Sequence, residues 1–287
     1  MNNRKILKEL LEKKEILVAP GAHDVLTAKV IEQIGFKAVY MTGYGQAASS
    51  LGKPDVGLLT MTEMLDRASK FVSAVDVPII ADADTGFGNA LGVMRTVEMY
   101  EKAGVSAIQL EDQVAPKRCG HMTGREVVSM DEMIGKIEAA IEARQDKDFL
   151  IIARSDARTT HGFEESLKRV KAYEKAGADI IFLESLESKE EMEILNKEIS
   201  SPTLANMVEG GRTPLCTNGE LERIGYSIAI WPTASTYMTA YMMKELMKEL
   251  KHKGTTKGKM NQMISFKDFN NLIGLNDYNK LGEKYIR

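Results

Sequence analysis

The sequence has few cysteines and no excess of basic charge. Cys119 and Cys216 are the only two among its 287 residues, and they lie far apart in the chain. Two such cysteines form no disulfide framework, so we expect both thiols to be free and the protein to work in the reducing cytoplasm. The formal net charge of -3 provides no positive field for a polyanion. Nucleic acid is therefore not an expected partner.

Long apolar runs are also missing. The longest ones have the length of a β-strand and fall far short of the roughly 20 residues that a membrane-spanning helix needs. The first residues, MNNRKILKELLEKKE, are charged and helix-forming, and they contain neither the apolar core nor the small-residue cleavage site of a signal peptide. We expect a globular protein without a membrane contact, and the composition, 44% hydrophobic and 28% charged, is typical of one.

A short apolar run followed by a helical stretch recurs along the chain. Eight runs are rich in Val, Ile, Leu and Ala without strict alternation, as in parallel strands that are buried on both faces. They read EILVAPG, KAVYMTG, VPIIADADTG, SAIQLED, FLIIARSD, DIIFLES, SPTLANM and SIAIWP. Stretches such as LTAKVIEQIG and FEESLKRVKAYEKAG separate them, and several of these end in glycine, the preferred residue at a helix C-terminus.

Eight strand–helix units in a chain of this length predict an α/β fold, a (β/α)8 TIM-type barrel. The near-copies YEKAGVSAIQLED and YEKAGADIIFLES support the repeating unit. A doubly wound open sheet is the alternative. We expect the barrel to span residues 1–250, and residues 251–287 to form a C-terminal helical extension. Such an extension often packs on a neighbouring subunit, so we expect an oligomer.

Polar residues gather at the predicted C-terminal ends of the strands, where barrels of this type hold their chemistry. From six strands they include Tyr40, Thr42, Gly43, Tyr44, Asp82, Asp84, Glu111, Arg154, Glu184 and Asn206. An arginine in this position can bind a carboxylate through two parallel hydrogen bonds. A surface ion pair is the alternative for Arg154, but the deeply apolar run before it, LIIA, argues against this.

Two of these residues indicate a metal site. Asp82 and Asp84 are two positions apart in a strand, so their side chains can point the same way. Anions so close repel each other unless a cation joins them, and hard oxygen ligands suit Mg2+ or Mn2+. The alternative is that the aspartates cap the following helix. Glu111 on the next strand adds a third carboxylate and favours the metal site.

The segment APKRCGHMTGRE, residues 115–126, combines a thiol with positive charge. Lys117, Arg118 and His121 surround Cys119, and such neighbours favour the thiolate and attract an anionic substrate. A thiol without a role is the alternative. No Cys-x-x-Cys pair or histidine cluster supports a zinc site here. Cys216 lacks this setting and is expected to be inert, while His23 and His161 on strand-end loops could contact the site or be structural.

The motif KRCGH resembles the lysine–(lysine or arginine)–cysteine–glycine–histidine signature of the isocitrate lyase and phosphoenolpyruvate mutase superfamily. The resemblance extends over nearly the whole chain through VYMTGYGQAASSLGKPDVGLLT, DADTGFGN, IQLEDQV, IIARSDA, FLES, LANM and GY..AIWP. It implies an α/β barrel, usually a homotetramer with an exchanged C-terminal helix. It also implies that the protein binds Mg2+, with Mn2+ as a possible substitute, and 2-hydroxy or 2-oxo carboxylic acids.

Within this superfamily the loop cysteine is typical of members that cleave carbon–carbon bonds, so the resemblance implies a lyase of the compact branch. That branch acts on 2,3-dimethylmalate or 2-methylisocitrate, and carboxyphosphonoenolpyruvate mutases also keep the cysteine. Enzymes for the tricarboxylate carry an arginine shortly after the proline of the eighth strand, and Tyr237 stands at the corresponding position. A tyrosine lacks the charged fork that a carboxylate prefers. We therefore expect the dicarboxylate (2R,3S)-2,3-dimethylmalate as substrate, with 2-methylisocitrate as the alternative substrate. An alternative from another functional class is a non-catalytic barrel that binds a keto acid.

The resemblance also implies a role for each candidate residue. Asp82, Asp84 and Glu111 would hold Mg2+, with Asp55 supporting them through hydrogen bonds. The substrate would be bound by Thr42, Gly43, Tyr44, Gly120, Arg154, Glu184 and Asn206. Tyr40 is a candidate base, although it could equally be a packed strand residue. Cys119 would act as general acid beside Lys117, Arg118 and His121, and the loop from 117 to 124 is expected to close over the substrate.

Overall fold

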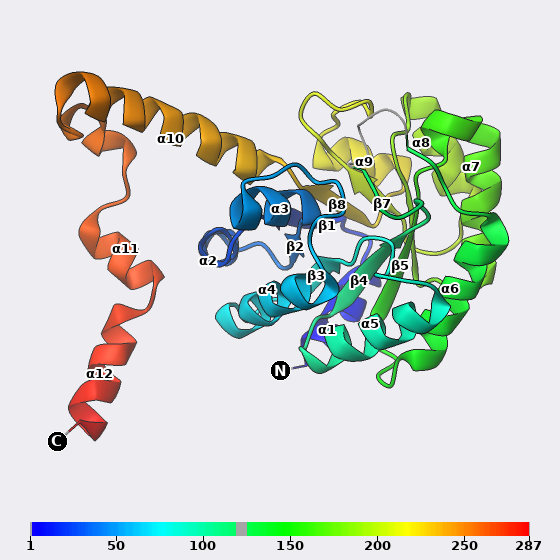
Figure 1. The fold of residues 1–287 in the computed structure, drawn as a ribbon, viewed down its shortest axis with the longest axis horizontal. Helices are drawn as coiled ribbons and strands as arrows, with labels where there is room; N and C mark the ends of the chain where they lie inside the picture. Colours follow the sequence, from blue (N-terminus) through cyan, green and yellow to red (C-terminus); the bar gives the residue numbers. More distant parts are fainter. Residues whose placement is uncertain (1, 119–124, 287) are drawn as a thin grey trace.

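The protein is built on one eight-stranded parallel sheet, which lies inside the ring of helices in Figure 1. The computed structural model describes residues 2–118 and 125–286. The strands are β1 (Leu17–Ala22), β2 (Val39–Met41), β3 (Ile79–Asp82), β4 (Ala107–Glu111), β5 (Leu150–Ser155), β6 (Ile180–Leu183), β7 (Leu204–Asn206) and β8 (Ile228–Trp231). They follow the order β6-β5-β4-β3-β2-β1-β8-β7, and a parallel bridge between Ile181 and Thr203 joins the two ends of this order. The predicted (β/α)8 barrel is confirmed, and the open sheet is excluded.

Helices surround this sheet and alternate with its strands. They are α1 (Asn3–Leu11), α2 (Val25–Ile34), α3 (Gly43–Leu51), α4 (Met61–Ala74), α5 (Ala90–Lys102), α6 (Met130–Ala143), α7 (Arg158–Lys175), α8 (Lys189–Glu198), α9 (Asn218–Ile224) and α10 (Ala234–Lys253). The glycines that the sequence places after helices have the left-handed backbone such positions require. Gly35 after α2 has φ 102°, and Gly225 after α9 has φ 114°.

The strands are buried on both faces, which explains their nearly continuous apolar sequences. Neighbouring residues on one strand belong to different layers of the core. On β3, Ile80 packs inside the barrel with Phe182 of β6, whereas Ile79 packs in the layer between strands and helices. Leu7 of α1 is fully buried and packs with the interior residues. This arrangement leaves the opposite end of the barrel, where the strands finish, for polar side chains.

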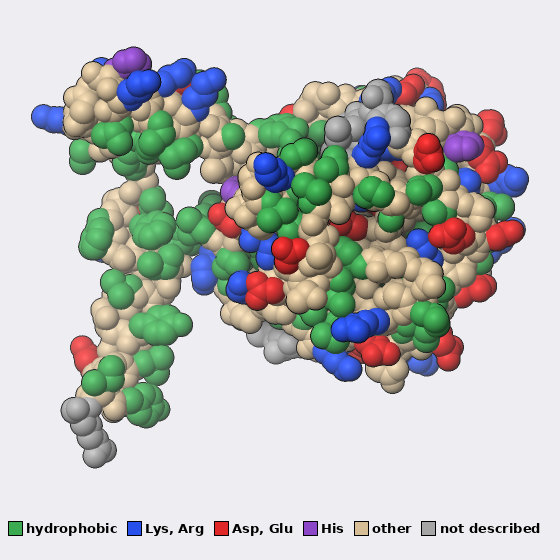
Figure 2. Space-filling view, viewed as in Figure 1, with side chains coloured by type: hydrophobic (Ala, Val, Ile, Leu, Met, Phe, Trp, Pro, Cys, Tyr) green, Lys and Arg blue, Asp and Glu red, His purple; other side chains and the backbone are tan. Residues whose placement is uncertain are grey.

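The C-terminal segment projects away from the barrel. Helix α10 follows β8 and extends outward (Figure 1). It is followed by a short 3-10 helix (Lys257–Gln262), α11 (Phe266–Leu272) and α12 (Leu275–Tyr285). None of the residues of α10, α11 and α12 is buried. Figure 2 shows hydrophobic side chains gathered along this segment. Within the described residues, no helix is both long and apolar enough to cross a membrane.

Candidate active site

A pocket opens at the C-terminal ends of the strands, where the sequence predicts the site. It is lined by Tyr40, Thr42, Tyr44, Asp55, Asp82, Lys117, Arg154, Glu184, Asn206, Val208, Pro232, Thr233 and Tyr237. The structure therefore brings together candidate residues from six of the strand ends or the loops after them. Sequence reasoning missed Val208, Pro232 and Thr233, because apolar and hydroxyl side chains after a strand carry no chemical signal of their own.

Asp82 is fixed at the end of β3 by the start of α3. Its Oδ2 accepts a hydrogen bond from the backbone N–H of Gly43 at 3.2 Å, and its Oδ1 accepts one from the N–H of Asp84 at 3.0 Å. A Cβ on Gly43 would lie 2.5 Å from this Oδ2, so only glycine permits the contact. The alternative in which Asp82 and Asp84 cap the following helix is wrong, because Asn89 caps α5.

Lys117 lies between two buried carboxylates. Its Nζ is 2.7 Å from Asp55 Oδ2 and 2.9 Å from Asp84 Oδ1. Burial alone would lower the pKa of Lys117, but Asp84 and Asp55 outweigh it and raise that pKa well above its ordinary value. The lysine is thus charged and fixed, and Asp55 contacts the lysine ammonium directly.

Asp84 and Glu111 are buried carboxylates that lie beside Lys117 and Arg154, respectively. Burial raises the pKa of Asp84 to about 6 against the opposing effect of Lys117, and burial raises the pKa of Glu111 well above its usual range. Within the described residues, Glu111 Oε1 has no hydrogen-bond partner. No three acidic, histidine or cysteine side chains of the described residues come together as a ready metal centre. The orphaned oxygen and the hard-oxygen ligand set nevertheless suit the preferences of Mg2+.

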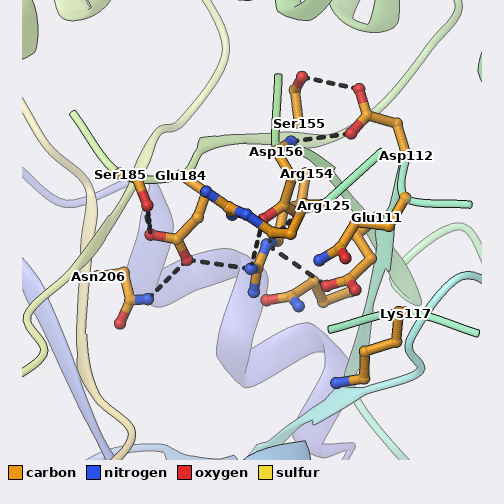
Figure 3. Close-up of polar contacts among 12 residues, drawn as sticks. Glu111, Asp112, Lys117, Arg125, Arg154, Ser155, Asp156, Glu184, Ser185 and Asn206 are labelled. Atoms are coloured by element: carbon orange, nitrogen blue, oxygen red, sulfur yellow. Dashed lines mark hydrogen bonds and ion pairs between the residues drawn. The ribbon is translucent and has the colours of Figure 1, made fainter. Parts of the chain in front are cut away.

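Arg154 at the end of β5 is surrounded by carboxylates (Figure 3). Asp156 accepts two hydrogen bonds from its Nε and Nη2, at 2.8 and 2.9 Å. Glu184 lies 3.2 Å from Nη2 and Glu111 lies 3.4 Å from Nε. The register that pairs Glu111 with Arg154 across β4 and β5 places this charge pair side by side. Burial opposes the charge, but Asp156 and the other carboxylates raise the pKa of Arg154 well above its ordinary value.

Two further candidates complete the wall near Arg154. Asn206 Nδ2 donates to Glu184 Oε2 at 2.9 Å, and the N–H of Ser185 donates to Glu184 Oε1 at 2.7 Å. Glu184 is therefore held by its neighbours and in turn faces Arg154. The predicted pair of Glu184 and Asn206 thus lies in one hydrogen-bonded group with the arginine.

Tyr40 is a buried hydrogen-bond donor. Its hydroxyl donates to Gln109 Oε1 at 2.9 Å. Burial, with the nearby Asp82 carboxylate, raises the pKa of Tyr40 well above 10, so the phenol keeps its proton. This geometry agrees with the packed-tyrosine alternative in part, although the ring also lines the pocket. On the other wall, Tyr44 meets Tyr237 edge to face at 6.0 Å between ring centroids.

The remaining candidates lie at or beyond the edge of the described structure. Cys119, Gly120, His121 and most of the loop that is expected to close lie outside the described residues. Arg118 precedes them, and Gln113 holds its backbone N–H at 2.9 Å and its carbonyl oxygen at 2.8 Å. His23 is buried with its Nδ1 3.0 Å from Ser235 Oγ, and neither it nor the largely exposed His161 lines the pocket.

The site can therefore bind a small anion with several oxygen atoms. Carboxylates for a hard cation lie at the pocket, and the charged Arg154 lies beside one of them, Glu111. An arginine and a divalent cation that face the same space are suited to a hydroxy acid or keto acid, whose carboxylate and adjacent oxygen can be bound at once.

Comparisons with known proteins agree with this geometry. The family model described as phosphoenolpyruvate phosphomutase matches residues 7–251. The chain is 60% identical over 285 residues to a 2,3-dimethylmalate lyase of Eubacterium barkeri, covering 99% of both chains. It is 43% identical over 275 residues to a 2-methylisocitrate lyase of Aeropyrum pernix, covering 96% of this chain and 88% of the relative.

Solved structures give the same result. A crystal structure of a 2,3-dimethylmalate lyase, described as a member of the PEP mutase/isocitrate lyase superfamily, superimposes with a TM-score of 0.93 at 38% identity, covering 99% of this chain and 95% of the other. A phosphonopyruvate hydrolase in complex with oxalate and Mg2+ superimposes with a TM-score of 0.90 at 30% identity, covering 100% of both chains.

The close contact between α3 and β3 can be tested with Gly43→Ala. The added Cβ would push Asp82 away and break its hydrogen bond with the backbone of residue 43, so we expect unfolding to require about 1–3 kcal/mol less free energy in urea titrations. Gly135→Ala in α6 is the matched control, because its Cβ would meet nothing within 4 Å. That variant should be as stable as the wild type or up to about 1 kcal/mol more stable. Equal stabilities of the two variants would contradict the role of the contact.

Proposed function

The chain belongs to the phosphoenolpyruvate mutase/isocitrate lyase superfamily, and on this premise we propose that it is a Mg2+-dependent carbon–carbon lyase that cleaves 2,3-dimethylmalate into pyruvate and propionate. The observation that carries the substrate is the 60% identity to a 2,3-dimethylmalate lyase over 99% of both chains. The pocket of carboxylates around one arginine supports the same reaction class.

The charges of the pocket favour a dicarboxylate over the tricarboxylate 2-methylisocitrate. Among the described residues that line the pocket, the cations are Lys117 and Arg154, and Lys117 is already bound by two carboxylates. The lining also contains Val208, Pro232 and the edge-to-face pair of Tyr44 and Tyr237. A methyl group suits this part of the lining, whereas a third carboxylate would lose its hydration there without gaining a cation.

Asp82, Asp84 and Glu111 fit the magnesium ion that the reaction class requires. They are buried oxygen ligands, and among the described residues Glu111 Oε1 has no hydrogen-bond partner. Asp55 would act indirectly, by holding Lys117 beside Asp84. When bound, Mg2+ would supply a Lewis acid that stabilises negative charge on the oxygen of the 2-hydroxyl group. Mn2+, which shares the preference for oxygen ligands, is a plausible substitute.

The protein side chains would bind and orient the substrate. Arg154 would bind the carboxylate of the pyruvyl half, and the N-terminus of α3 at residues 42–44 would assist with its positive dipole end. Glu184 and Asn206 would hold the arginine in place. Val208 and Pro232 would exclude water from the methyl-bearing half of the molecule.

Cleavage requires two proton movements. The bond between C2 and C3 breaks as the 2-hydroxyl loses its proton and becomes the carbonyl of pyruvate, and the electron pair stays on C3 of the departing acid. Cys119 would give its proton to that carbon, and Arg118 and His121 would hold the negative charge on the departing carboxylate. Lys117 in this role stays a prediction, and its ion pairs with Asp55 and Asp84 weigh against it. Tyr40 as the base for the hydroxyl proton stays a prediction, and its raised pKa weighs against it.

The exposed C-terminal segment supports an oligomer with exchanged helices. Phe266 of α11 is 87% exposed, and Tyr278 and Tyr285 of α12 are 73% and 67% exposed. Apolar side chains in such number along one segment are rarely left in water, so they indicate a contact with another chain. We propose a homotetramer in which this segment packs against a neighbouring copy.

A cytoplasmic location is proposed as well, from two cysteines without a disulfide framework.

The substrate can be decided by assaying both acids side by side. Purified protein with Mg2+ should release pyruvate from 2,3-dimethylmalate with a kcat/KM at least about tenfold above that for 2-methylisocitrate, because the third carboxylate lacks a cationic partner. Excess EDTA should abolish the release and added Mg2+ should restore it. Faster cleavage of 2-methylisocitrate would contradict the substrate, and full activity in EDTA would contradict the metal.

Cys119→Ser tests the proton donor. A serine hydroxyl is a far weaker acid than a thiol, so we expect kcat for 2,3-dimethylmalate to fall by about 10^2-fold or more, while KM changes little. Cys216→Ala is the matched control, because this buried cysteine packs near Met207 outside the pocket and its loss should leave kcat unchanged. Wild-type turnover by Cys119→Ser would refute the general-acid role.

The role of the C-terminal segment is measurable by light scattering. The wild-type protein should have the mass of a tetramer, and the double variant Phe266→Asp/Tyr278→Asp should dissociate into smaller species, because each charge would be buried in an apolar contact. Changing Lys267 and Lys280 on the same two helices to Asp is the matched control, and it should leave the mass unchanged. A wild-type monomer at micromolar concentration would rule out the exchanged helix.

A further inference from the structure

Asp156 binds two arginines at once. One is Arg154 in the pocket, which it holds through two hydrogen bonds of 2.8 and 2.9 Å. The other is Arg125, whose Nη1 donates to Asp156 Oδ1. The side chains of Arg125 and Asp156 are 1% and 0% exposed. The carboxylate between the two guanidinium groups is therefore shielded from water, and the two arginines interact through it (Figure 3).

Arg125 is itself fixed by the polypeptide around it. Its neighbours pair with the segment after β4, because the N–H of Val114 donates to the Glu126 carbonyl oxygen at 2.9 Å and the N–H of Val128 donates to that of Asp112 at 2.8 Å. Its Nη2 donates to Thr159 Oγ1. Within the described residues, its buried Nε has no hydrogen-bond partner.

The backbone of Asp156 is held by a second carboxylate behind it. Asp112 Oδ1 accepts the N–H of Asp156 at 2.8 Å. Asp112 Oδ2 accepts the hydroxyl groups of Ser155 at 2.7 Å and Tyr173 at 2.8 Å. Asp112 is fully buried, so this network fixes the main chain from which the side chain of Asp156 projects. The remaining freedom of Asp156 is the rotation of its carboxylate, which Arg125 restricts together with Arg154 and Gln113.

Arg154 could bind its carboxylate neighbours in more than one way. Glu111, Asp156 and Glu184 all lie within 3.4 Å of its guanidinium group. The printed contacts with these carboxylates run from Nε and Nη2, and Asp156 engages both of these atoms. The orientation of Asp156 therefore decides which edge of Arg154 is left for another carboxylate.

We propose that Arg125 is a positioning residue for substrate binding, which acts through Asp156 to hold Arg154 with its Nη1 edge presented to the carboxylate of the keto-acid half. The proposal rests on the proposed function, because it assumes that Arg154 binds this carboxylate. Arg125 neutralises part of the charge of Asp156 and fixes its Oδ1. Without it, Arg154 and Gln113 would be the remaining side-chain partners of the Asp156 carboxylate among the described residues, so Arg154 would be held less firmly in place.

The test compares Arg125→Gln, Arg125→Lys and a matched control, Arg158→Gln. Arg158 lies on the same rim and pairs with Glu187 and Glu191, but it does not line the pocket. KM and kcat for 2,3-dimethylmalate would be measured together with the Kd of oxalate in the presence of Mg2+ by calorimetry. Oxalate is a suitable probe because the structure of a related phosphonopyruvate hydrolase contains it with Mg2+.

For Arg125→Gln we expect KM to rise about tenfold and the Kd of oxalate to weaken by a similar factor, while kcat stays within about threefold, because the arginine binds ground state and transition state alike. Arg125→Lys keeps the charge without the planar fork, so it should lose about threefold. Arg158→Gln should match the wild type in KM and Kd. A merely structural Arg125 would lower the melting temperature without this selective change in KM and Kd.

Other outcomes separate the two claims. If Arg125→Gln does not fold, Arg125→Lys and Thr159→Val decide, since Thr159→Val removes the hydroxyl that holds the arginine and should raise KM about twofold to threefold. Unchanged oxalate affinity in all folded variants would overturn the positioning role. If the wild type binds oxalate but cleaves no 2,3-dimethylmalate, the proposed function fails while the oxalate affinities still decide the role of Arg125.

Discussion

The burial of charge at the barrel mouth is the constraint on which this structure depends. Carboxylates in a water-poor pocket are costly unless cations accompany them. The protein meets this cost with two centres, Lys117 between Asp55 and Asp84, and Arg154 among Glu111, Asp156 and Glu184. Each centre joins residues from different strands or from the loops after them. The pairing of charge thus fixes how these strand ends sit relative to one another.

The barrel makes this pairing possible through its register. In parallel strands the C-terminal ends meet at one edge of the sheet, so Glu111 of β4 stands beside Arg154 of β5. On the other side of Glu111, the N–H of Gly43 at the start of α3 binds Asp82. The apolar strands below hold these residues rigidly, because Ile79 and Ile80 are buried in different layers of the core.

Much of this arrangement could be predicted from the sequence, and the reasons for the rest are physical. The eight strands were predictable because burial on both faces leaves continuous apolar runs, and the polar residues that follow them mark the barrel mouth. The partners of Lys117 were not predictable. Its position in the sequence, two residues before Cys119, suggests a role beside the thiol, whereas the fold brings Asp55 and Asp84 to its ammonium group. Arg125 carries no motif at all. The spacing of Arg154 and Asp156, two apart at a strand end, was the one signal that could have indicated their bidentate pair.

An imbalance of charge remains after these pairs are formed. Asp82, Asp84 and Glu111 face Lys117 and Arg154, and each of these cations already serves other carboxylates among the described residues. The raised pKa values of Asp84 and Glu111 are the consequence, because burial without a full counter-charge favours the protonated form. A divalent cation would relieve this excess, and an anionic substrate alone would increase it. The acidic cluster is therefore the physical reason to expect that the cation and the dicarboxylate bind together. Arg154, which Asp156 holds in place, would then bind the part of the substrate that the cation does not contact.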